Sequence, residues 1–431
     1  MGSARLLKTI VVGGGLAGLT AAATLARGGH AVTVLDGAEH VGGRARSRNK
    51  DGFDINIGPH ALYRAGGGLA VLKGLGLRPR GRIPRTHRAG VWRSGEIVPA
   101  FREWRQTVSH RASWARAASG LRPEAAADLA GTPADSWIER VTRGDDAGVA
   151  FLASLLRTET YTGDLSILDA GAAARHLRVA MQSVLYLDEG WSTLVDGLVG
   201  TIRAAGGDIR TRSTVEAVEY DEAGVRSVRL VNGTTMSSHA AVIAVNDPPK
   251  LLRLLDGPLP LSIPAAVADT VPVRMAHLDV ALRPLPTRRF PNVFGLDEPL
   301  FISVPSDVAR VAPAGAGVVN VGRYLRPGEE GVHHRPSLER LLDSCQPGWR
   351  DHVVDVRYTP RSMVAGDHVR YATRGSLERL TVDAVGVPGM TIAGDWIGPV
   401  GMLADASILS GAAAARSVVG VLTRTPASAM A

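Results

Sequence analysis

The pattern of apolar and polar positions predicts a strand, a helix and a second strand at the start of the chain. Residues 9–12 form a short apolar, β-branched run, which is typical of a buried strand. Residues 16–27 are rich in alanine and predict a helix, which the glycine pair at 28–29 ends. Residues 30–35 predict the second strand. Two strands joined by a helix indicate a βαβ unit, and therefore a parallel sheet.

Three later segments extend this pattern. Residues 190–220 predict a helix, a glycine stop and two short strands, and residues 241–255 predict a strand, a proline-rich turn and a helix. Residues 391–415 predict a buried strand, a Gly-Asp turn and a helix of small residues that starts near Leu403. Because strands alternate with helices in all of these segments, the expected fold class is α/β.

A glycine motif with the spacing G-x-G-x-x-G stands between the first predicted strand and its helix. Gly13 permits the tight turn, Gly15 lets the backbone approach a pyrophosphate, and Gly18 lets the helix pack against the strand. The helix N-terminus offers N–H groups to the phosphates, and Asp36, at the end of the second strand, can accept hydrogen bonds from a ribose. The whole unit predicts a dinucleotide site. Its expected contacts are Gly13, Gly15, Leu16, Ala17, Gly18 and Asp36.

The segment after the second strand favours a flavin dinucleotide over a nicotinamide one. A Gly-Gly-Arg run within residues 40–47 lets the backbone pass close to a ligand, and its arginine can reach a phosphate or the flavin edge. Residues 52–63 predict a short strand and a turn. An extended flavin dinucleotide needs contacts of this kind, whereas a nicotinamide enzyme does not. The segment adds Gly43, Arg44, Gly58, Pro59 and His60 to the expected contacts.

Together, GGGLAGLTAA, the acid after it, GGRARS and GFDINIGPH resemble the flavin-containing amine oxidase superfamily, which includes the phytoene, carotene and squalene-linked desaturases. The resemblance is close over the first sixty and the last forty residues and loose between them. It implies FAD as the cofactor, held in a Rossmann-like domain that the C-terminal segment closes. It also implies a second, cap domain that holds a small organic substrate.

The resemblance implies roles for several later residues. Asp395 resembles the acid that hydrogen-bonds a ribityl hydroxyl, and the helix from Leu403 would direct N–H groups at the flavin pyrimidine edge. The backbone of Val215 would pair with the adenine. The family has Glu-Gly-Ala where this chain has Asp405, Ala406 and Ser407, which leaves the contact at Asp405 open. The implied contacts are Val215, Gly394, Asp395, Met402 and Leu403.

Two segments interrupt the nucleotide-binding pattern. We expect a discontinuous FAD-binding domain, with an α+β cap over it. The first cap segment is helical and rich in arginine, and the second holds alternating strands. In the first, Phe101, Trp104, Val108, Ala112 and Ala115 fall on one helical face. The FAD-binding domain is expected at residues 1–75, 186–265 and 356–431, and the cap at 76–185 and 266–355.

Composition excludes several classes of protein. The one cysteine, Cys345, allows no disulfide within the chain, fits a reducing cytoplasm and lies outside any motif that could attach a flavin covalently. No Cys/His spacing suggests a metal site. The chain has no uncharged apolar run of eighteen residues, so no membrane span is expected.

Charge is concentrated in one segment. Residues 78–122 carry eleven arginines against Glu96 and Glu103, within a net charge of +8. Three tryptophans, Trp92, Trp104 and Trp114, are interleaved with the arginines. No nucleic-acid motif accompanies the segment, so nucleic acid is not an expected partner. The segment is therefore either a solvated helical face or a peripheral contact with an anionic membrane surface.

The reaction is the least determined feature. Family amine oxidases place a lysine on a cap strand, but this cap has none, and the corresponding strand, Val271–Arg283, offers Arg274 and His277. Only 5% of the residues are aromatic, and A-G-D-W at 393–396 is more similar to the desaturases. The sequence favours an FAD-dependent C–C desaturation of an apolar substrate, with C–N oxidation of an amine, or a non-catalytic flavoprotein, as alternatives. His60 and His277 are the candidate substrate-facing residues, and the oligomeric state stays open.

Overall fold

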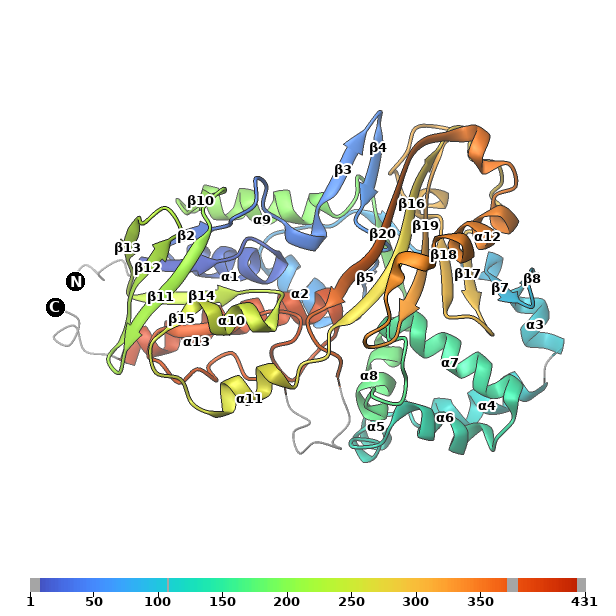
Figure 1. Ribbon diagram of the computed structural model, residues 1–431, viewed down its shortest axis with the longest axis horizontal. Helices are drawn as coiled ribbons and strands as arrows, with labels where there is room; N and C mark the ends of the chain where they lie inside the picture. Colours follow the sequence, from blue (N-terminus) through green and yellow to red (C-terminus); the bar gives the residue numbers. More distant parts are fainter. Residues whose placement is uncertain (1–7, 107, 370–378, 425–431) are drawn as a thin grey trace.

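The computed structural model describes residues 8–106, 108–369 and 379–424. The chain forms two parts that lie side by side, one built on a five-stranded parallel sheet and the other on a seven-stranded sheet (Figure 1). Both termini extend from the end of the first part that is remote from the second (Figure 1). The α/β class is therefore confirmed, with a Rossmann-like part and an α+β part.

The parallel sheet has an order that reverses next to its first strand. The order is β10 (Asp208–Arg210), β2 (Ala31–Leu35), β1 (Lys8–Val12), β14 (Ala240–Ala244) and β21 (Met390–Ala393). Every neighbouring pair is parallel. The chain leaves β1 toward β2 on one side and later places β14 on the other. A crevice opens at such a point, beyond the carboxyl ends of the strands.

Both faces of the parallel sheet are covered. Helices α1 (Leu16–Arg27), α9 (Ser192–Ala204) and α13 (Leu403–Arg424) cover one face. The other face packs on a sheet made of β11 (Val215–Asp221), β12 (Gly224–Leu230), β13 (Thr235–Ser237) and β15 (Leu255–Asp256). Val11 and Val242 face the helices, whereas Ile10 and Ile243 face the second sheet. Burial on both faces explains the continuous apolar runs in the sequence.

Small residues let α1 and α13 approach closely. A Cβ atom added at Gly411 would overlap the carbonyl oxygen of Ala17. Ser410 links helix α13 to the turn after β21, because its Oγ accepts a hydrogen bond from the Gly394 N–H at 3.0 Å. The C-terminal helix is made of small residues, as the sequence predicts, and these residues allow it to pack closely against α1.

The second part combines both cap segments in one sheet. Its order is β20 (Val353–Ala365), β16 (Val273–Leu282), β19 (Gly317–Leu325), β18 (Leu300–Ser303), β17 (Asn292–Gly295), β7 (Gly90–Arg93) and β8 (Glu96–Pro99). Strand β7, from the first segment, pairs in parallel with β17, from the second. Helix α12 (Arg335–Cys345) covers one face of this sheet. The two cap segments therefore form one structural unit.

A layer of helices completes the cap (Figure 1). Its members are α3 (Ala100–Gln106), α4 (Val108–Ser119), α5 (Pro123–Asp128), α6 (Ala134–Thr142), α7 (Asp146–Thr160) and α8 (Ala170–Ala180). The helical face predicted from Phe101 to Ala115 is divided between α3 and α4. The side chains of Trp104 and Val108 lie outside the described residues.

Two expected domain boundaries fall inside strands. Strand β20 pairs with β16 from Val353 onward, so the boundary at 356 lies within the cap sheet. Strand β9 (Val184–Leu187) likewise contains the boundary at 186. A strand that is hydrogen-bonded along its length moves as one element, so the limits shift to the ends of these strands. The rest of the domain division stays a prediction.

The remaining strands and α-helices are short. They are β3 (Ser47–Lys50), β4 (Phe53–Asn56), β5 (Leu62–Tyr63), β6 (Gly81–Arg82), α2 (Gly67–Gly74), α10 (Pro248–Leu254) and α11 (Ser262–Ala268). The strand predicted within 241–255 corresponds to β14, and the helix predicted there corresponds to α10. Within the described ranges, no helix is both long and apolar enough to cross a bilayer.

Candidate active site

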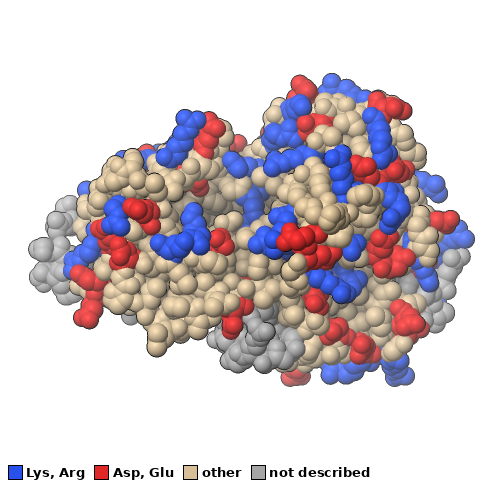
Figure 2. Space-filling view, in the orientation of Figure 1, with Lys and Arg blue, Asp and Glu red and all other residues tan. Residues whose placement is uncertain are grey.

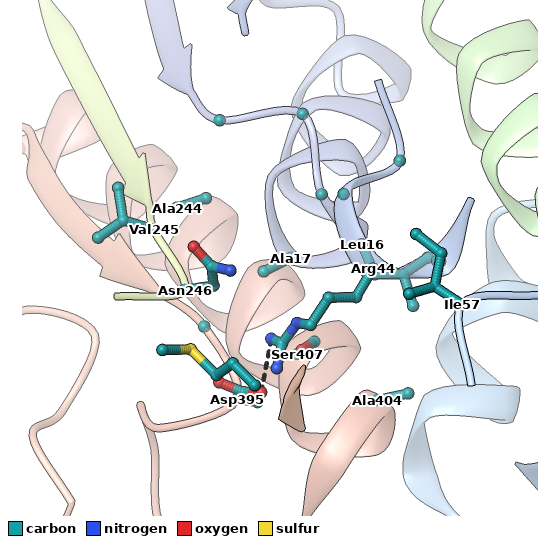
Figure 3. Close-up of a pocket in the computed structure, with 18 of the residues that line it drawn as sticks. Leu16, Ala17, Arg44, Ile57, Ala244, Val245, Asn246, Asp395, Ala404 and Ser407 are labelled. Atoms are coloured by element: carbon teal, nitrogen blue, oxygen red, sulfur yellow. Dashed lines mark hydrogen bonds and ion pairs between the residues drawn. The ribbon is translucent and has the colours of Figure 1, made fainter. Parts of the chain in front are cut away.

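A cavity of about 350 Å³ lies where the carboxyl ends of the parallel strands meet β16 and β20 of the cap. Its wall contains segments from the start, the middle and the end of the chain (Figure 3). Most of the expected cofactor contacts line it. They are Gly13, Gly15, Leu16, Ala17, Asp36, Gly43, Arg44, Pro59, His60, Val215, Gly394, Asp395 and Leu403. The structure thus brings together the residues that the glycine motifs and the resemblance had nominated.

The glycine turn has the shape that a dinucleotide phosphate requires. Gly13 has a φ of +101°, which favours glycine, and an added Cβ would overlap the Ala244 carbonyl oxygen. An added Cβ at Gly15 would meet no protein atom within 4 Å, so this position is bare toward the cavity. Leu16 and Ala17 start helix α1 at the same wall, where their N–H groups have no partner within the helix. These residues fit the pyrophosphate of FAD.

Asp36 holds the glycine turn as well as lining the cavity. Its Oδ2 accepts a hydrogen bond from the Gly14 N–H at 2.6 Å, and its Oδ1 accepts one from the Ala38 N–H at 2.7 Å. The carboxylate therefore anchors the loop after β1 to the loop after β2. Each of its oxygens keeps a second lone pair that could accept a ribose hydroxyl.

Arg44 and Asp395 bind each other across the cavity wall (Figure 3). Nη2 of Arg44 lies 2.6 Å from Oδ2 of Asp395, and Nη1 donates to the Val364 carbonyl oxygen. Oδ1 of Asp395 accepts from the Gly366 N–H at 3.1 Å. The guanidinium, which we expect at a phosphate or at the flavin edge, pairs with this carboxylate while Arg44 also lines the cavity, so the expected contact stays a prediction. The two side chains still present their remaining polar atoms at the cavity surface.

Three expected contacts lie behind the wall rather than in it: Gly18, Gly58 and Met402. A Cβ at Gly18 would overlap the Gly13 carbonyl oxygen, so this glycine serves helix packing, as predicted. Gly58 has a φ of +76° and makes the turn that exposes the next two residues to the cavity. Met402 is buried among the cap helices.

Asp405, the open position in the C-terminal motif, has a structural contact. Its Oδ1 accepts a hydrogen bond from the Gly68 N–H at 2.6 Å, at the start of helix α2. Burial raises the pKa of this carboxyl, which the α2 N–H groups partly oppose. Asp405 lines neither cavity described here, so it closes a helix end rather than touching the cofactor site.

Strand β16 presents His277 to the first cavity. Alternation along the strand directs Met275 and His277 to the cavity and Leu278 to the core under α12. His277 is fully buried, and its Nδ1 lies 3.1 Å from Oδ2 of Asp279, out of line for a hydrogen bond. Asp279 also accepts hydrogen bonds from the Gly58 N–H and from Asn320. The prediction that His277 lies at the cofactor site fits this position, but it does not line the second cavity.

His60 lies between the two cavities. Its Nδ1 is 3.0 Å from the Gly58 carbonyl oxygen, and its ring packs edge-on against Trp191. Burial lowers the pKa of His60, so the neutral imidazole is favoured. Of the two candidate histidines, His60 lines both cavities and His277 lines the cofactor cavity, and a substrate-facing role stays a prediction for each.

The second cavity, of about 620 Å³, lies between the cap sheet and the cap helices. It shares a wall with the first, formed by Pro59, His60, Ala61, Tyr63 and Tyr161. Most of its remaining lining is apolar, with side chains such as Leu155, Phe294 and Phe301. A molecule in this cavity would reach the cofactor cavity through the shared wall, so this cavity is the candidate substrate site.

One carboxyl faces the second cavity without a cationic partner among the described residues. Glu159 is half-buried there, and the hydroxyl of Tyr63 lies 3.4 Å from its Oε2. Burial raises the pKa of Glu159 to about 7, and the Tyr63 hydrogen bond opposes the shift. The other acid in the lining, Glu103, pairs with Arg93 at 2.8 Å. Sequence reasoning missed Glu159.

A signal for Glu159 was present in the sequence. Leu152, Leu155, Leu156 and Glu159 follow the spacing i, i+3, i+4 and i+7 along α7, so the acid occupies a position of the apolar stripe. An acid at such a position is expected to be buried or to face a cavity. The stripe alone does not show which of the two applies.

Cys345 is remote from both cavities. Its thiol is buried under α12 and lies 3.5 Å from the Phe290 carbonyl oxygen, and burial raises its pKa to about 12. It lines neither cavity. In the described part of the chain, no group of acids, histidines or cysteine has the geometry to hold a metal ion.

The fold and the two adjoining cavities define a dinucleotide-dependent oxidoreductase with a substrate cap. The chain belongs to the flavin containing amine oxidoreductase family, which residues 16–419 match. It is therefore a flavin-dependent oxidoreductase of that family. FAD, when bound, supplies the acceptor for a hydride. The glycine turn, Asp36 and the C-terminal segment are the residues that would hold it.

Solved structures share the fold, and curated proteins are similar over a short stretch. An oxidoreductase from Methanosarcina mazei has the same fold, with a TM-score of 0.74 and 17% identity over 94% of this chain and 99% of that one. Putrescine oxidase bound to putrescine has a TM-score of 0.67 and 17% identity, over 96% and 99% of the two chains. An L-amino-acid oxidase from Pseudechis australis is 53% identical over 57 residues, 13% of this chain and 11% of that protein. The chain thus matches about a tenth of the length of such curated relatives.

Proposed function

We propose that this protein uses FAD to remove a hydride equivalent from the carbon next to nitrogen in an apolar amine, bound in the second cavity. The observation that carries the proposal is Glu159, a carboxyl without a cationic partner among the described residues, in a mostly apolar substrate cavity. A buried carboxyl of this kind costs free energy in the empty protein, and a protonated nitrogen would offset that cost.

Glu159 can convert a bound ammonium ion into the neutral amine, which is the reactive form. An amine enters as an ammonium ion, and its proton passes to the Glu159 carboxylate, so that one N–H bond breaks and one O–H bond forms. The apolar lining favours the neutral amine and the neutral carboxyl over the two ions. The hydroxyl of Tyr63, which belongs to the shared wall, then orients the protonated carboxyl. The nitrogen keeps the lone pair that forms the new C=N bond when the hydride leaves.

C–C desaturation, which the sequence favours, is the second candidate. The apolar side chains that form most of the second cavity support it, because a hydrocarbon needs shape and dryness rather than acid–base groups. Under this alternative, Glu159 stays protonated and binds no charge. The two candidates therefore differ in what the carboxyl does, and a substitution at Glu159 separates them.

We also propose that FAD is held without a covalent bond. The described residues that line the cofactor cavity include no cysteine, and the cavity's bare glycine wall supports binding through backbone contacts. A cytoplasmic location is proposed on the basis of the reduced, buried Cys345.

The test is anaerobic reduction of the bound flavin by alkylamines and by polyenes of matched length. We expect amines to bleach the flavin, with a rate that changes through pH 7 as Glu159 titrates. Glu159→Gln should lower the reductive rate by roughly a hundredfold and remove the pH step. Glu103→Gln, in the same cavity but at an ion-paired position, is the matched control and should stay within about twofold. Bleaching by polyenes alone would favour desaturation, and bleaching by neither would favour a non-catalytic flavoprotein.

A further inference from the structure

The substrate cavity reaches the protein surface at a ring of apolar side chains. Ile83, Phe101 and Met181 line the cavity, yet they are 44%, 63% and 54% exposed. Residues that both line a cavity and face solvent mark its opening. In the described part of the chain, eight large apolar side chains are more than a third exposed, and the other five line neither cavity. We call these three residues the apolar rim.

The rim is built on ordered elements from separate parts of the cap. Strand β6 pairs with β9, which brings Ile83 next to the chain that follows Met181. Helix α3, which carries Phe101, packs against the short helix at Thr86–Arg88 on the same side of the cavity. Because three segments converge to expose apolar atoms at one opening, the exposure is a property of the fold rather than of a loose chain end.

Three exposed arginines adjoin the rim in the sequence, and the acid next to Phe101 and Arg102, Glu103, is paired with Arg93. Arg82 precedes Ile83, Arg102 follows Phe101, and Arg178 lies one helical turn before Met181, and all three arginines are exposed. Arg82 and Arg178 form no ion pair with any described acid. On the face drawn in Figure 2, basic and acidic side chains are interspersed. The rim thus combines exposed apolar side chains with two arginines, Arg82 and Arg178, that no described acid neutralises.

We propose that the apolar rim docks on the surface of an anionic lipid membrane, so that the substrate cavity opens toward the acyl chains. Apolar side chains would enter the boundary between headgroups and acyl chains, while the arginines contact the anionic headgroups. An apolar substrate could then pass from the lipid into the cavity without crossing water. The proposal uses the proposed function only in treating the second cavity as the substrate site.

This surface differs from the tryptophan-bearing patch expected from residues 78–122. Trp92 is fully buried and donates to Glu298 at 3.0 Å, so it cannot anchor a membrane. Trp114 packs inside the cap helices. The side chain of Trp104 lies outside the described residues. Phe101 and its two partners replace the tryptophans as the apolar contact.

The test is sedimentation of the flavin-loaded full chain with vesicles of phosphatidylglycerol or of phosphatidylcholine. We expect binding to the anionic vesicles, and a loss of at least tenfold in the variant Ile83→Ser/Phe101→Ser/Met181→Ser. The control variant Val231→Ser/Leu261→Ser removes side chains that are 64% and 90% exposed but lie away from both cavities, and should stay within twofold. No binding by the parent protein, or equal losses in both variants, would overturn the proposal.

A second arm tests the charges and the other occupant. Arg82→Gln with Arg178→Gln should weaken binding to anionic vesicles by about tenfold at low salt, and added salt should reduce the difference. Unchanged binding in this variant would contradict the proposal. Sedimentation velocity without lipid tests whether the rim binds a second copy of the chain. A dimer in the parent protein that becomes a monomer in the apolar-rim variant would assign the rim to self-association instead. Neither experiment requires substrate turnover, so the vesicle-binding and sedimentation results could still be interpreted if the proposed reaction were wrong.

Discussion

Arg44 and Asp395 are 351 residues apart in the sequence, and their side chains meet at 2.6 Å. The arginine belongs to the segment after the first βαβ unit, and the aspartate follows β21, near the end of the chain. The Asp395 side chain is 1% exposed, whereas that of Arg44 is 29% exposed. The pair therefore joins the two glycine-rich segments of the cofactor site, and its two halves are buried unequally.

Unequal burial predicts unequal effects of the two substitutions. Arg44→Gln leaves the buried carboxylate of Asp395 with the Gly366 N–H and the charge of Arg379, which forms no ion pair with it, and should lower the free energy of unfolding by about 2–4 kcal/mol. Asp395→Asn leaves a partly exposed guanidinium and should cost about 1–2 kcal/mol. Urea unfolding of the flavin-free variants measures both. Equal losses, or a larger loss for Asp395→Asn, would show that the pair does not carry a buried charge.

Gly15 and Gly18 should respond differently to a valine. Gly15 has a φ of −77° and no protein atom near its Cβ position, so Gly15→Val should fold normally but lose the flavin and its colour. Gly18→Val would drive its side chain into the Gly13 carbonyl and should destabilise the apoprotein by at least about 1–3 kcal/mol. Absorbance at the flavin band and thermal melts separate the two outcomes. A fully yellow Gly15→Val protein would show that the phosphates bind elsewhere.

Asp36 should matter to the cofactor more than to the fold. Asp36→Ala removes its hydrogen bonds to the turn and the ribose, each worth roughly 0.5–1.5 kcal/mol, so flavin retention should fall by one to two orders of magnitude. Equilibrium dialysis of FAD measures this change. Heat-denatured parent protein should release free FAD into the supernatant. Recovery of a nicotinamide dinucleotide, or of flavin in the pellet, would contradict non-covalent FAD.

Glu159 should lower stability as pH rises. Its folded-state pKa, about 7, lies above the ordinary value of 4.5, so folding favours the protonated form. This preference reduces the free energy of unfolding progressively between pH 4.5 and 7, and the loss stays constant above that range. Glu159→Gln should therefore be more stable than the parent at pH 8, by on the order of 1–2 kcal/mol because the cavity admits some water, and equal to it below pH 4. A pH-independent difference would mean that Glu159 does not titrate in this range.

The sequence predicted the residues of the cofactor cavity more completely than those of the substrate cavity. The glycine motif, Asp36 and the C-terminal turn all line one cavity because local rules fix them: a strand, a tight turn and a helix N-terminus. The direction of Arg44 could not be predicted, because its partner is brought in by a strand from the other end of the chain. Asp279, which lies beside His277 and accepts from the Gly58 N–H, depends on the same kind of long-range packing.

The substrate side depends on which elements face each other across a cavity. Glu159 lies on the apolar stripe of helix α7. The sequence of that stripe does not show whether it packs in a core or lines a cavity. Trp92 shows the opposite error, because an aromatic residue among arginines suggested a surface, whereas β7 places it in the core of the cap sheet. Composition along a segment records charge, but only the packing of sheet on helix decides which side chains reach solvent.

The parallel sheet has a consequence for how the chain is made. Strand β1 pairs with β14, and β14 pairs with β21, which begins at Met390 of 431 residues. During synthesis, the free edge of β14 and the apolar side of α1 stay uncovered until this last strand and α13 leave the ribosome. Contacts of such sequence separation form slowly. Because Gly394 and Asp395 complete the cofactor wall, flavin can be enclosed only after β21 and the turn that follows it have been synthesised, and a chain cut short before β21 should aggregate before it can bind its cofactor.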